Sequence, residues 1–316
     1  MDIGLYRDLA VGAAPDGAEA WTRQDELATG LTIGAPPDPF SAQGQNWNIP
    51  PLNPIAGAAQ GWNGLAQLYR ANMRHAGVLR VDHAMGLTRL FVLPEGGKPS
   101  DGTYLKLPFD DLLGVVTLES QRARCALLGE DLGTVPEGFR PAMAERNVLG
   151  MSVLWFERDG VGFVSPKRYP SLSVASVSTH DLATLAGWWI GADIGERLML
   201  GLDAPDAARR ALEAREAEKR ALSETLIRAG HLAAVPDPDT PLSDEVAAAI
   251  HAFVAGSGAL LMLAQMDDLA GESIGTNLPG TDKERANWRR RLGLDADAAL
   301  MGSRGAAILA AMAERS

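Results

Sequence analysis

The sequence predicts an α/β fold in which parallel strands alternate with covering helices. Short apolar segments of β type recur along the chain of 316 residues, and amphipathic helical segments separate them. This alternation is typical of parallel βαβ units, whose sheets are covered on both faces. The length allows two ordinary domains or one α/β barrel, since barrels run to about 250 residues or more.

Six strands and several helices follow from the pattern. The predicted strands are residues 3–12 (IGLYRDLAVG), 78–82 (VLRVD), 125–130 (CALLGE), 149–156 (LGMSVLWF), 173–179 (SVASVST) and 258–265 (GALLMLAQ). The predicted helices between them are residues 65–77, 110–124 and 136–147. Each strand is short and bounded by Gly, Pro or polar residues, as strands of a covered sheet are.

A helical insertion is predicted at residues 195–257, within one catalytic barrel domain that covers residues 1–316. Residues 205–230 are rich in Ala, Glu and Arg and form a solvated helix, and a Pro/Asp linker, AVPDPDTPLSD, leads to a helix near residues 245–254. No internal repeat or low-complexity tail is found.

Composition excludes several function classes. Lys and Arg number 29 against 40 Asp and Glu, for a formal charge of −11, which disfavours a nucleic-acid or anionic-membrane partner. Arg7 and Asp8 interrupt any secretion signal, and the apolar segment at residues 252–266 is too short to span a bilayer, so a cytoplasmic protein is expected. The single Cys125 excludes an internal disulfide and a cysteine-based metal cluster.

Ionisable side chains follow three of the predicted strands. They are Arg80, Asp82 and His83 in VLRVDHAMGL, Glu130 and Asp131 in CALLGEDLG, and His180 and Asp181 in SVSTHDL. In a parallel α/β barrel, residues just past the C-terminal strand ends converge on one pocket. We therefore expect these side chains to form a site.

Each group also has a structural interpretation. Arg80 and Asp82, two apart on one strand, suit an ion pair, and the segment after Glu130 suits a helix start with Thr134 as N-cap and Pro136 at the first position. Asp181 likewise suits a helix cap. Burying several carboxylates at strand ends costs several kcal/mol unless pairing or chemistry compensates, so the joint functional interpretation is favoured.

Facing carboxylates in one cleft suit glycosidic-bond cleavage, with one as nucleophile or base and one as protonated acid. Two polar loops suit a sugar, because amides hydrogen-bond hydroxyls and tryptophan covers the apolar face of a pyranose. The loop FSAQGQNWNIPPLNP contributes Gln43, Gln45, Asn46, Trp47 and Asn48, and the loop NLPGTDKERANW contributes Asn277, Thr281, Asn287 and Trp288. A loop staple is the structural alternative for Trp47.

Two other function classes remain open. A metal-dependent barrel hydrolase would use His83, Glu130, Asp131, His180 and Asp181 as ligands, but no histidine lies between His83 and His180, which disfavours a histidine-rich metal cluster. A catalytically silent sugar-binding protein would not need an acid/base pair.

Several blocks of the chain resemble the 4-α-glucanotransferases of the amylomaltase or disproportionating-enzyme type. The blocks GLYRDLAVGAAPDGAEAW, GQNWNIPPLNP, RVDHAMGL, GEDLGTVP, VSTHDLATLAGWW and NLPGTDKERANWRRRL follow that family's order from residue 3 to about residue 292. Two positions depart from it. Asn48 stands where glycine is expected, and ESIGTNLPGT replaces the usual EQVNLPGT.

The resemblance implies a (β/α)8 TIM-barrel enzyme that transfers segments of α-1,4-glucans and maltooligosaccharides through a glucosyl-enzyme intermediate and needs neither a metal nor an organic cofactor. Hydrolysis by the same carboxylates is the closest alternative. The resemblance implies Asp82 as nucleophile, Glu130 as general acid/base and Asp181 as transition-state carboxylate. Arg80, His83 and His180 would be their partners, and Trp47, Gln45, Asn46, Asp131 and Asn277 would bind substrate. It also implies that the chain starts near the third barrel strand, so weak activity is expected from residues 1–316 alone.

Overall fold

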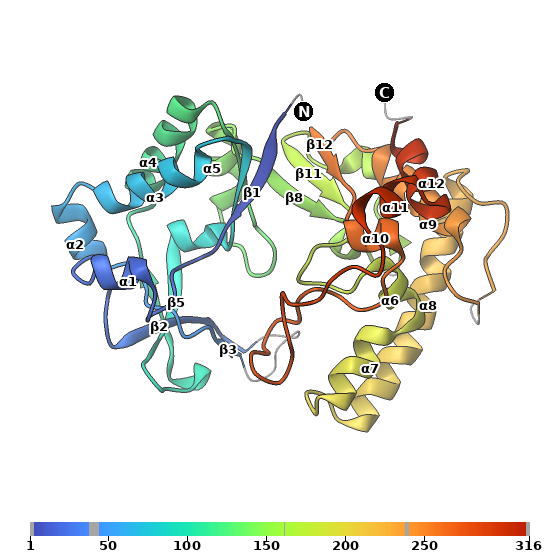
Figure 1. Ribbon diagram of the computed structural model, residues 1–316, viewed down its shortest axis with the longest axis horizontal. Coiled ribbons are helices and arrows are strands. Elements are labelled where there is room, and N and C mark those ends of the chain that lie inside the picture. Colours follow the sequence, from blue (N-terminus) through green and yellow to red (C-terminus); the bar gives the residue numbers. More distant parts are fainter. Residues whose placement is uncertain (1–2, 38–43, 161, 238–239, 314–316) are drawn as a thin grey trace. The chain divides into compact units, whose positions relative to one another are not determined.

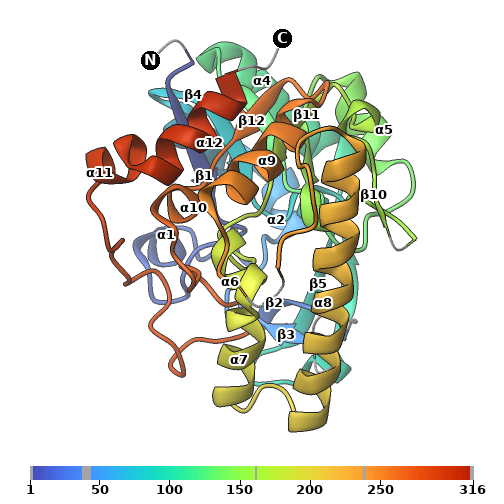
Figure 2. The ribbon, with the colours of Figure 1, turned by 90° about the vertical axis from the view of Figure 1, so that its right-hand side faces the viewer.

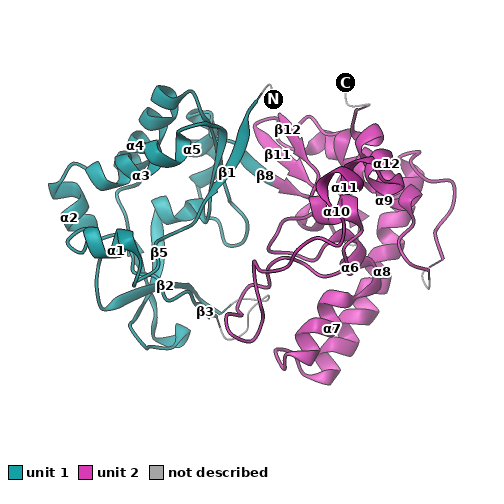
Figure 3. Cartoon of the chain, in the orientation of Figure 1, with its two compact units in different colours: residues 1–151 teal, residues 152–316 magenta. Residues whose placement is uncertain are grey.

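The computed structural model describes residues 3–37, 44–160, 162–237 and 240–313 (Figure 1). Gln43 and residues 238–239 of the predicted linker lie outside this described part of the chain. The chain divides into two compact units, residues 1–151 and residues 152–316 (Figure 3). Each unit has its own hydrophobic core. The α/β class predicted from the sequence is confirmed.

The first unit is built on a parallel sheet whose strand order is β1-β4-β7. Its strands are β1 (Leu5–Leu9), β4 (Ala76–Val81) and β7 (Ala126–Gly129), all three within predicted segments or next to them. In the register, Leu9 pairs with Val81 and Val81 with Gly129. The three strands therefore end level with one another, at the same edge of the sheet.

Helices separate these strands, as the pattern predicted. Helix α3 (Asn63–Met73) precedes β4 and helix α4 (Phe109–Ala123) precedes β7, and the two helices pack together beside the sheet (Figure 1). Helix α4 buries Leu112, Leu113 and Val116, which recur at helical spacing, and carries Asp110 and Asp111 in its first turn, where the helix dipole favours negative charge. The other helices of the unit are α1 (Ala18–Thr22), α2 (Pro54–Ala59), α5 (Phe139–Glu145) and the 3-10 turns η1 (Ala84–Leu87) and η2 (Pro99–Asp101).

A second, antiparallel sheet in this unit was not predicted. Its order is β3-β2-β5-β6, with strands β2 (Leu31–Ala35), β3 (Gln45–Asn46), β5 (Arg89–Pro94) and β6 (Thr103–Lys106). The loop that carries Gln45, Asn46 and Trp47 is thus fixed to β2. The segment RLFVLP, which forms β5, is an apolar run that could have been recognised as a strand, although its pairing with β2 could not.

The second unit contains the sheet β12-β11-β8, in which β11 and β12 are parallel. These strands are β8 (Gly150–Val153), β11 (Ser173–Ser176) and β12 (Leu261–Leu263), and a hairpin joins β9 (Arg158–Asp159) to β10 (Gly162–Phe163). The helices are α6 (Leu185–Ile190), α7 (Ala192–Met199), α8 (Pro205–Arg228), α9 (Asp244–Ala255), α10 (Met266–Ala270), α11 (Ala296–Met301) and α12 (Ser303–Ala313). Helix α7 lies beside the long helix α8 (Figure 2).

Two local predictions need correction. The predicted strand at residues 149–156 ends at Val153, because residues 154–156 form the 3-10 turn η3 (Leu154–Phe156); a further turn is η4 (Pro166–Arg168). Helix α5 begins at Phe139 after Gly138, whose φ of 78° suits glycine, so Thr134 is not its N-cap. In the described part of the chain, no helix combines the length and apolar character needed to cross a membrane.

Candidate active site

Asp82 and Glu130 occupy equivalent positions on neighbouring strands. Each is the first residue after its strand, and the backbone ladder continues through both, since Asp82 N–H donates to the Leu9 carbonyl at 3.0 Å and Glu130 N–H to the Val81 carbonyl at 2.9 Å. The parallel register therefore brings the two predicted carboxylates to adjacent places at one sheet edge.

Arg80 links Asp82 to a carboxylate that the sequence analysis did not select. Arg80 is 4% exposed, and its Nη1 lies 2.8 Å from Asp82 Oδ1 and 2.7 Å from Asp8 Oδ1. Burial alone would lower the pKa of this guanidinium, but the charges of Asp82 and Asp8 outweigh burial and raise it. Arg80 is therefore a permanent positive charge beside Asp82.

Glu130 is nearly buried and accepts two backbone hydrogen bonds. Its Oε2 accepts from His83 N–H at 3.0 Å and its Oε1 from Leu132 N–H at 2.7 Å. Burial raises the pKa of Glu130 to about 7, and the charge of Asp82 adds to this, while the two N–H groups and Arg80 oppose it without cancelling it. Such a carboxyl group can both give and take a proton near neutral pH.

His83 connects Glu130 to the Trp47 loop. Its backbone is left-handed, with φ of 46°, which aims the N–H at Glu130, and its ring meets the Trp47 ring edge-on at 5.4 Å between centroids. Burial, helped by the charge of Arg89, lowers the pKa of His83 to about 4. The imidazole is therefore neutral at pH 7.

Internal hydrogen bonds hold the Trp47 loop. Gln45 Oε1 accepts from Trp47 Nε1 at 3.0 Å, and Asn46 Oδ1 accepts from Thr32 Oγ1 at 2.8 Å and from Asn48 N–H at 2.9 Å. Asn48 has φ of 55°, a conformation that asparagine tolerates better than most residues, which explains how it replaces the expected glycine.

Asp131 differs from its neighbour Glu130. Its carboxylate is buried and both oxygens are used inside the protein, because Oδ2 lies 2.6 Å from Arg140 Nε and Oδ1 accepts from Met151 N–H at 2.9 Å. These contacts fix the chain just after Glu130. Both Asp131 oxygens thus have partners inside the protein, and the substrate contact expected for Asp131 stays a prediction.

In the second unit, the Asp181 carboxylate contacts two other predicted site residues, Asn277 and His180. Asn277 Nδ2 donates to Asp181 Oδ1 at 2.7 Å, and His180 Nε2 lies 3.1 Å from Asp181 Oδ2. Asp181 is not the helix cap that the structural alternative required, because Thr184 caps α6 by accepting from Gly187 N–H at 3.0 Å. The carboxylate of Asp181 thus sits in a loop, between an imidazole and an amide.

The sequence analysis missed a buried His–Asp pair that anchors this loop. Asp268 Oδ1 accepts from Leu185 N–H at 2.8 Å, at the start of α6, and Asp268 Oδ2 lies 3.9 Å from His251 Nε2. Both side chains are almost fully buried. The signal was available, because Asp267 and Asp268 follow the last predicted strand as the selected carboxylates follow theirs.

The two groups of this pair are neutral in mild acid. Burial raises the pKa of Asp268 to about 7 and lowers that of His251 to about 4. The His251 Nε2 and Asp268 Oδ2 atoms lie 3.9 Å apart, which is too long for a hydrogen bond. The shifted pKa values favour the uncharged forms of both groups, so the two side chains do not form a charged pair.

The Asp268→Asn variant should become more stable relative to the parent protein as pH rises from 5 to 8, because the parent protein loses stability when Asp268 ionises. A carboxyl group with a raised pKa stabilises the fold below its unfolded pKa, and that stability is lost as pH rises through the folded value near 7. Asparagine keeps the Leu185 hydrogen bond and has no charge to bury. Urea unfolding at pH 5 and 8 should show a relative gain of about 2–3 kcal/mol.

Asp203→Asn is the control. Its hydrogen bond from Arg197 lowers the pKa of Asp203, so it stays ionised throughout this range and the variant should show no such change with pH. A difference between Asp268→Asn and the parent that stays constant from pH 5 to 8 would contradict the titration of Asp268.

Within the described ranges, no group of three or more His, Cys, Asp or Glu side chains could hold a metal ion.

Comparison with known proteins identifies the family. Residues 1–295 match the family model described as 4-alpha-glucanotransferase. The curated 4-alpha-glucanotransferase of Mycobacterium tuberculosis (strain ATCC 25618 / H37Rv) is 40% identical over 294 residues, which are 92% of this chain and 40% of the relative. That of Haemophilus influenzae is 36% identical over 295 residues, covering 92% and 42%.

Solved structures agree. The crystal structure of amylomaltase from Corynebacterium glutamicum matches with a TM-score of 0.91 and 32% identity, over 97% of this chain and 46% of that one. The amylomaltase of Streptococcus agalactiae, solved with acarbose, has the same fold at a TM-score of 0.73 and 18% identity, over 98% and 56%. The chain spans about 40% of the length of these curated relatives. On these matches, the chain belongs to the 4-alpha-glucanotransferase family.

Proposed function

We propose that this chain carries the catalytic residues of a transferase that moves α-1,4-glucan segments from a donor maltooligosaccharide to the 4-hydroxyl of an acceptor glucan or glucose. The observation that carries the proposal is the pair at the sheet edge. Asp82 lies beside the charge of Arg80, while the pKa of neighbouring Glu130 is raised to about 7. This difference suits one carboxylate nucleophile and one general acid.

The spacing of the pair supports retention of configuration. Neighbouring strands lie about 4.8 Å apart, and retaining enzymes place their two carboxyl groups about 5–5.5 Å apart. Asp82 and Glu130, each the first residue after its strand, suit that spacing. The influence of Asp82 on the pKa of Glu130 supports their proximity.

In the first step, Asp82 attacks the anomeric carbon while Glu130 protonates the departing glycosidic oxygen. The glycosidic bond breaks, the reducing-end fragment leaves with the proton, and a glucosyl ester of Asp82 remains. Arg80 stabilises the Asp82 carboxylate before the attack, and the backbone N–H groups of His83 and Leu132 hold Glu130 in place.

In the second step, Glu130 is a carboxylate and removes the proton from the 4-hydroxyl of an acceptor sugar. That oxygen attacks the ester carbon, releases Asp82 and restores an α-linkage, so that Glu130 ends protonated as it began. We assign Asp181, with His180 and Asn277, to the sugar hydroxyls in the transition state. Trp47, Gln45 and Asn46 are assigned to the acceptor, and His83 to a neutral hydrogen-bonding role.

We further propose that the six parallel-type strands, β1, β4, β7, β8, β11 and β12, are strands of a (β/α)8 catalytic barrel. Residues 195–257 would be a helical insertion in that domain. The support is the similarity to the Corynebacterium glutamicum amylomaltase over 97% of the chain.

Product analysis with maltotriose tests the function. We expect glucose together with a ladder of longer maltooligosaccharides, because a second sugar intercepts the ester. Glucose and maltose without longer products would mean that water is the acceptor and that the protein is a hydrolase. Binding of maltotriose with no products would support a silent glucan-binding protein.

A further inference from the structure

We propose that Trp288 is a fixed platform on which a pyranose ring of the bound α-glucan stacks, beside the sugar held by Asp181. The inference rests on the proposed function, and it develops the expectation that the loop NLPGTDKERANW binds sugar into a defined stacking position in the second unit. Four observations carry it: the exposure of Trp288, its backbone conformation, the hydrogen bonds that hold it, and the pocket that it lines.

Trp288 is exposed in an unfavourable conformation. Its side chain is 60% exposed, and its φ is 60°, in the left-handed region that bulky residues avoid. Packing of this indole therefore contributes little to the stability of the fold, while its left-handed backbone conformation costs free energy. Strain of this kind collects where a ligand must be held, because the surrounding structure has to enforce it.

Hydrogen bonds on both sides of Trp288 enforce this conformation. Trp288 N–H donates to the Thr276 carbonyl at 3.1 Å. Its neighbour Asn287 accepts from Leu278 N–H at 3.1 Å and from Arg285 Nη1 at 2.8 Å, and donates to Thr281 Oγ1 at 2.9 Å. The indole is consequently presented by a loop that is already ordered, so that little entropy is lost when a ligand stacks on it.

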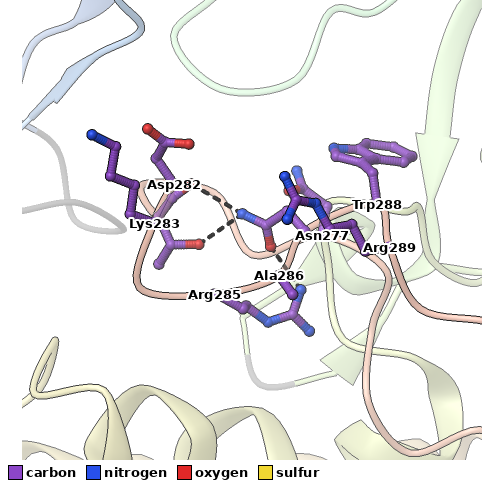
Figure 4. Close-up of a pocket in the computed structure, with 9 residues that line it drawn as sticks. Asn277, Asp282, Lys283, Arg285, Ala286, Trp288 and Arg289 are labelled. Atoms are coloured by element: carbon purple, nitrogen blue, oxygen red, sulfur yellow. Dashed lines mark hydrogen bonds between the residues drawn. The ribbon is translucent and has the colours of Figure 1, made fainter.

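The loop lines an open, polar pocket. Its volume is about 500 Å³, within the range of about 300–1,000 Å³ common for small-molecule sites. Figure 4 shows the Trp288 ring on one side of this pocket and Lys283 on the other, with Asn277 between them. An aromatic face with amide and cationic donors around it suits a neutral sugar, which needs stacking on its C–H face and hydrogen bonds to its hydroxyls.

The pocket adjoins Asp181 through two side chains. The His180 ring lies 5.0 Å from the Trp288 ring, and its Nε2 lies 3.1 Å from Asp181 Oδ2. Asn277 both lines the pocket and donates to Asp181 Oδ1. A glucan with one ring held at Asp181 therefore has its next ring within reach of Trp288.

The test measures binding of maltoheptaose by calorimetry, with every variant made in an Asp82→Asn background so that the sugar is not consumed. Trp288→Ala should weaken binding by about 3–10-fold, the range expected for one aromatic contact, and Trp288→Phe should recover part of the loss. Trp21→Ala is the matched control, because Trp21 is 77% exposed and lies in α1 of the other unit. It should leave binding unchanged.

Trp288→Gly separates a binding role from a structural one. Glycine accepts a φ of 60° without strain, so this variant should raise Tm by about 2 °C while it weakens maltoheptaose binding as much as Trp288→Ala does. A structural indole would instead give a lower Tm and unchanged binding.

Failure of the Trp288 platform can be told apart from failure of the proposed function. If Asp181→Ala weakens binding and Trp288→Ala does not, the platform is wrong and the proposed function stands. If the Asp82→Asn protein does not bind maltoheptaose at all, both proposals are overturned.

Discussion

Replacing Asp82 by Asn, or Glu130 by Gln, should lower the turnover of maltotriose by on the order of 10³-fold or more, while maltooligosaccharide binding is retained. In the proposed mechanism both carboxyl groups act in the transition state, so their loss should affect kcat more than ground-state binding. The measurement is disproportionation of maltotriose by a form of the protein that carries out this reaction. Near-parental turnover by either variant would remove that residue from the proposed mechanism.

A substrate with a good leaving group separates the two roles. α-Maltosyl fluoride departs with little help from an acid, so Glu130→Gln should cleave it far better than it cleaves maltotriose. Asp82→Asn should remain inactive on both, because no ester forms. Asp111→Asn and Glu145→Gln, which change exposed carboxylates of α4 and α5, should stay within about twofold of the parent protein.

Local pattern was sufficient to predict the parallel strands and the carboxylates at their ends. Asp82 and Glu130 directly follow short strands, and Asp181 lies five residues after the end of β11, in the loop that follows it, so these positions depend mainly on where each run stops. The same rule, applied once more, would have selected Asp268 after β12. The sequence pattern could not predict how deeply these carboxyl groups are buried, and burial raises the pKa of both Glu130 and Asp268 to about 7.

Features that depend on pairing between distant segments were not predicted. The antiparallel sheet joins β2 to β5 across more than fifty residues, and Leu90 to Leu93 of β5 are all buried, so that strand lacks the alternation that marks a hairpin. Asp8 was missed for the same reason. It faces Arg80 only because β1 and β4 pair in a register that sets Asp8 opposite Arg80.

That register gives Arg80 two tasks. Arg80 joins β4 to β1 through its contact with Asp8, and it places a positive charge beside Asp82. A structural ion pair and a contact to the predicted nucleophile were alternatives in the sequence, and one guanidinium contacts both Asp8 and Asp82. The two tasks should therefore separate when the partners are changed one at a time.

Arg80→Met should lower the free energy of unfolding by about 2 kcal/mol or more and turnover by about 10²-fold. Removing the buried guanidinium leaves the carboxylates of Asp8 and Asp82 without their shared positive partner. The loss of stability stays below that for a fully buried ion pair, because each carboxylate is about a third exposed to solvent. Turnover falls because the attacking carboxylate loses the charge that stabilises and orients it. Urea unfolding and maltotriose disproportionation measure the two effects.

Three further variants test this division. Arg80→Lys keeps the charge but loses the planar fork, so it should fall between the parent and Arg80→Met. Adding Asp8→Asn to Arg80→Met should restore part of the stability, since one of the two facing charges is removed, but should leave turnover low. Arg209→Met removes two exposed ion pairs on α8, with Asp206 and Glu213, and should change stability by less than about 0.5 kcal/mol. If the Asp8→Asn double variant instead recovered turnover along with stability, Arg80 would act on catalysis only by holding the sheet together.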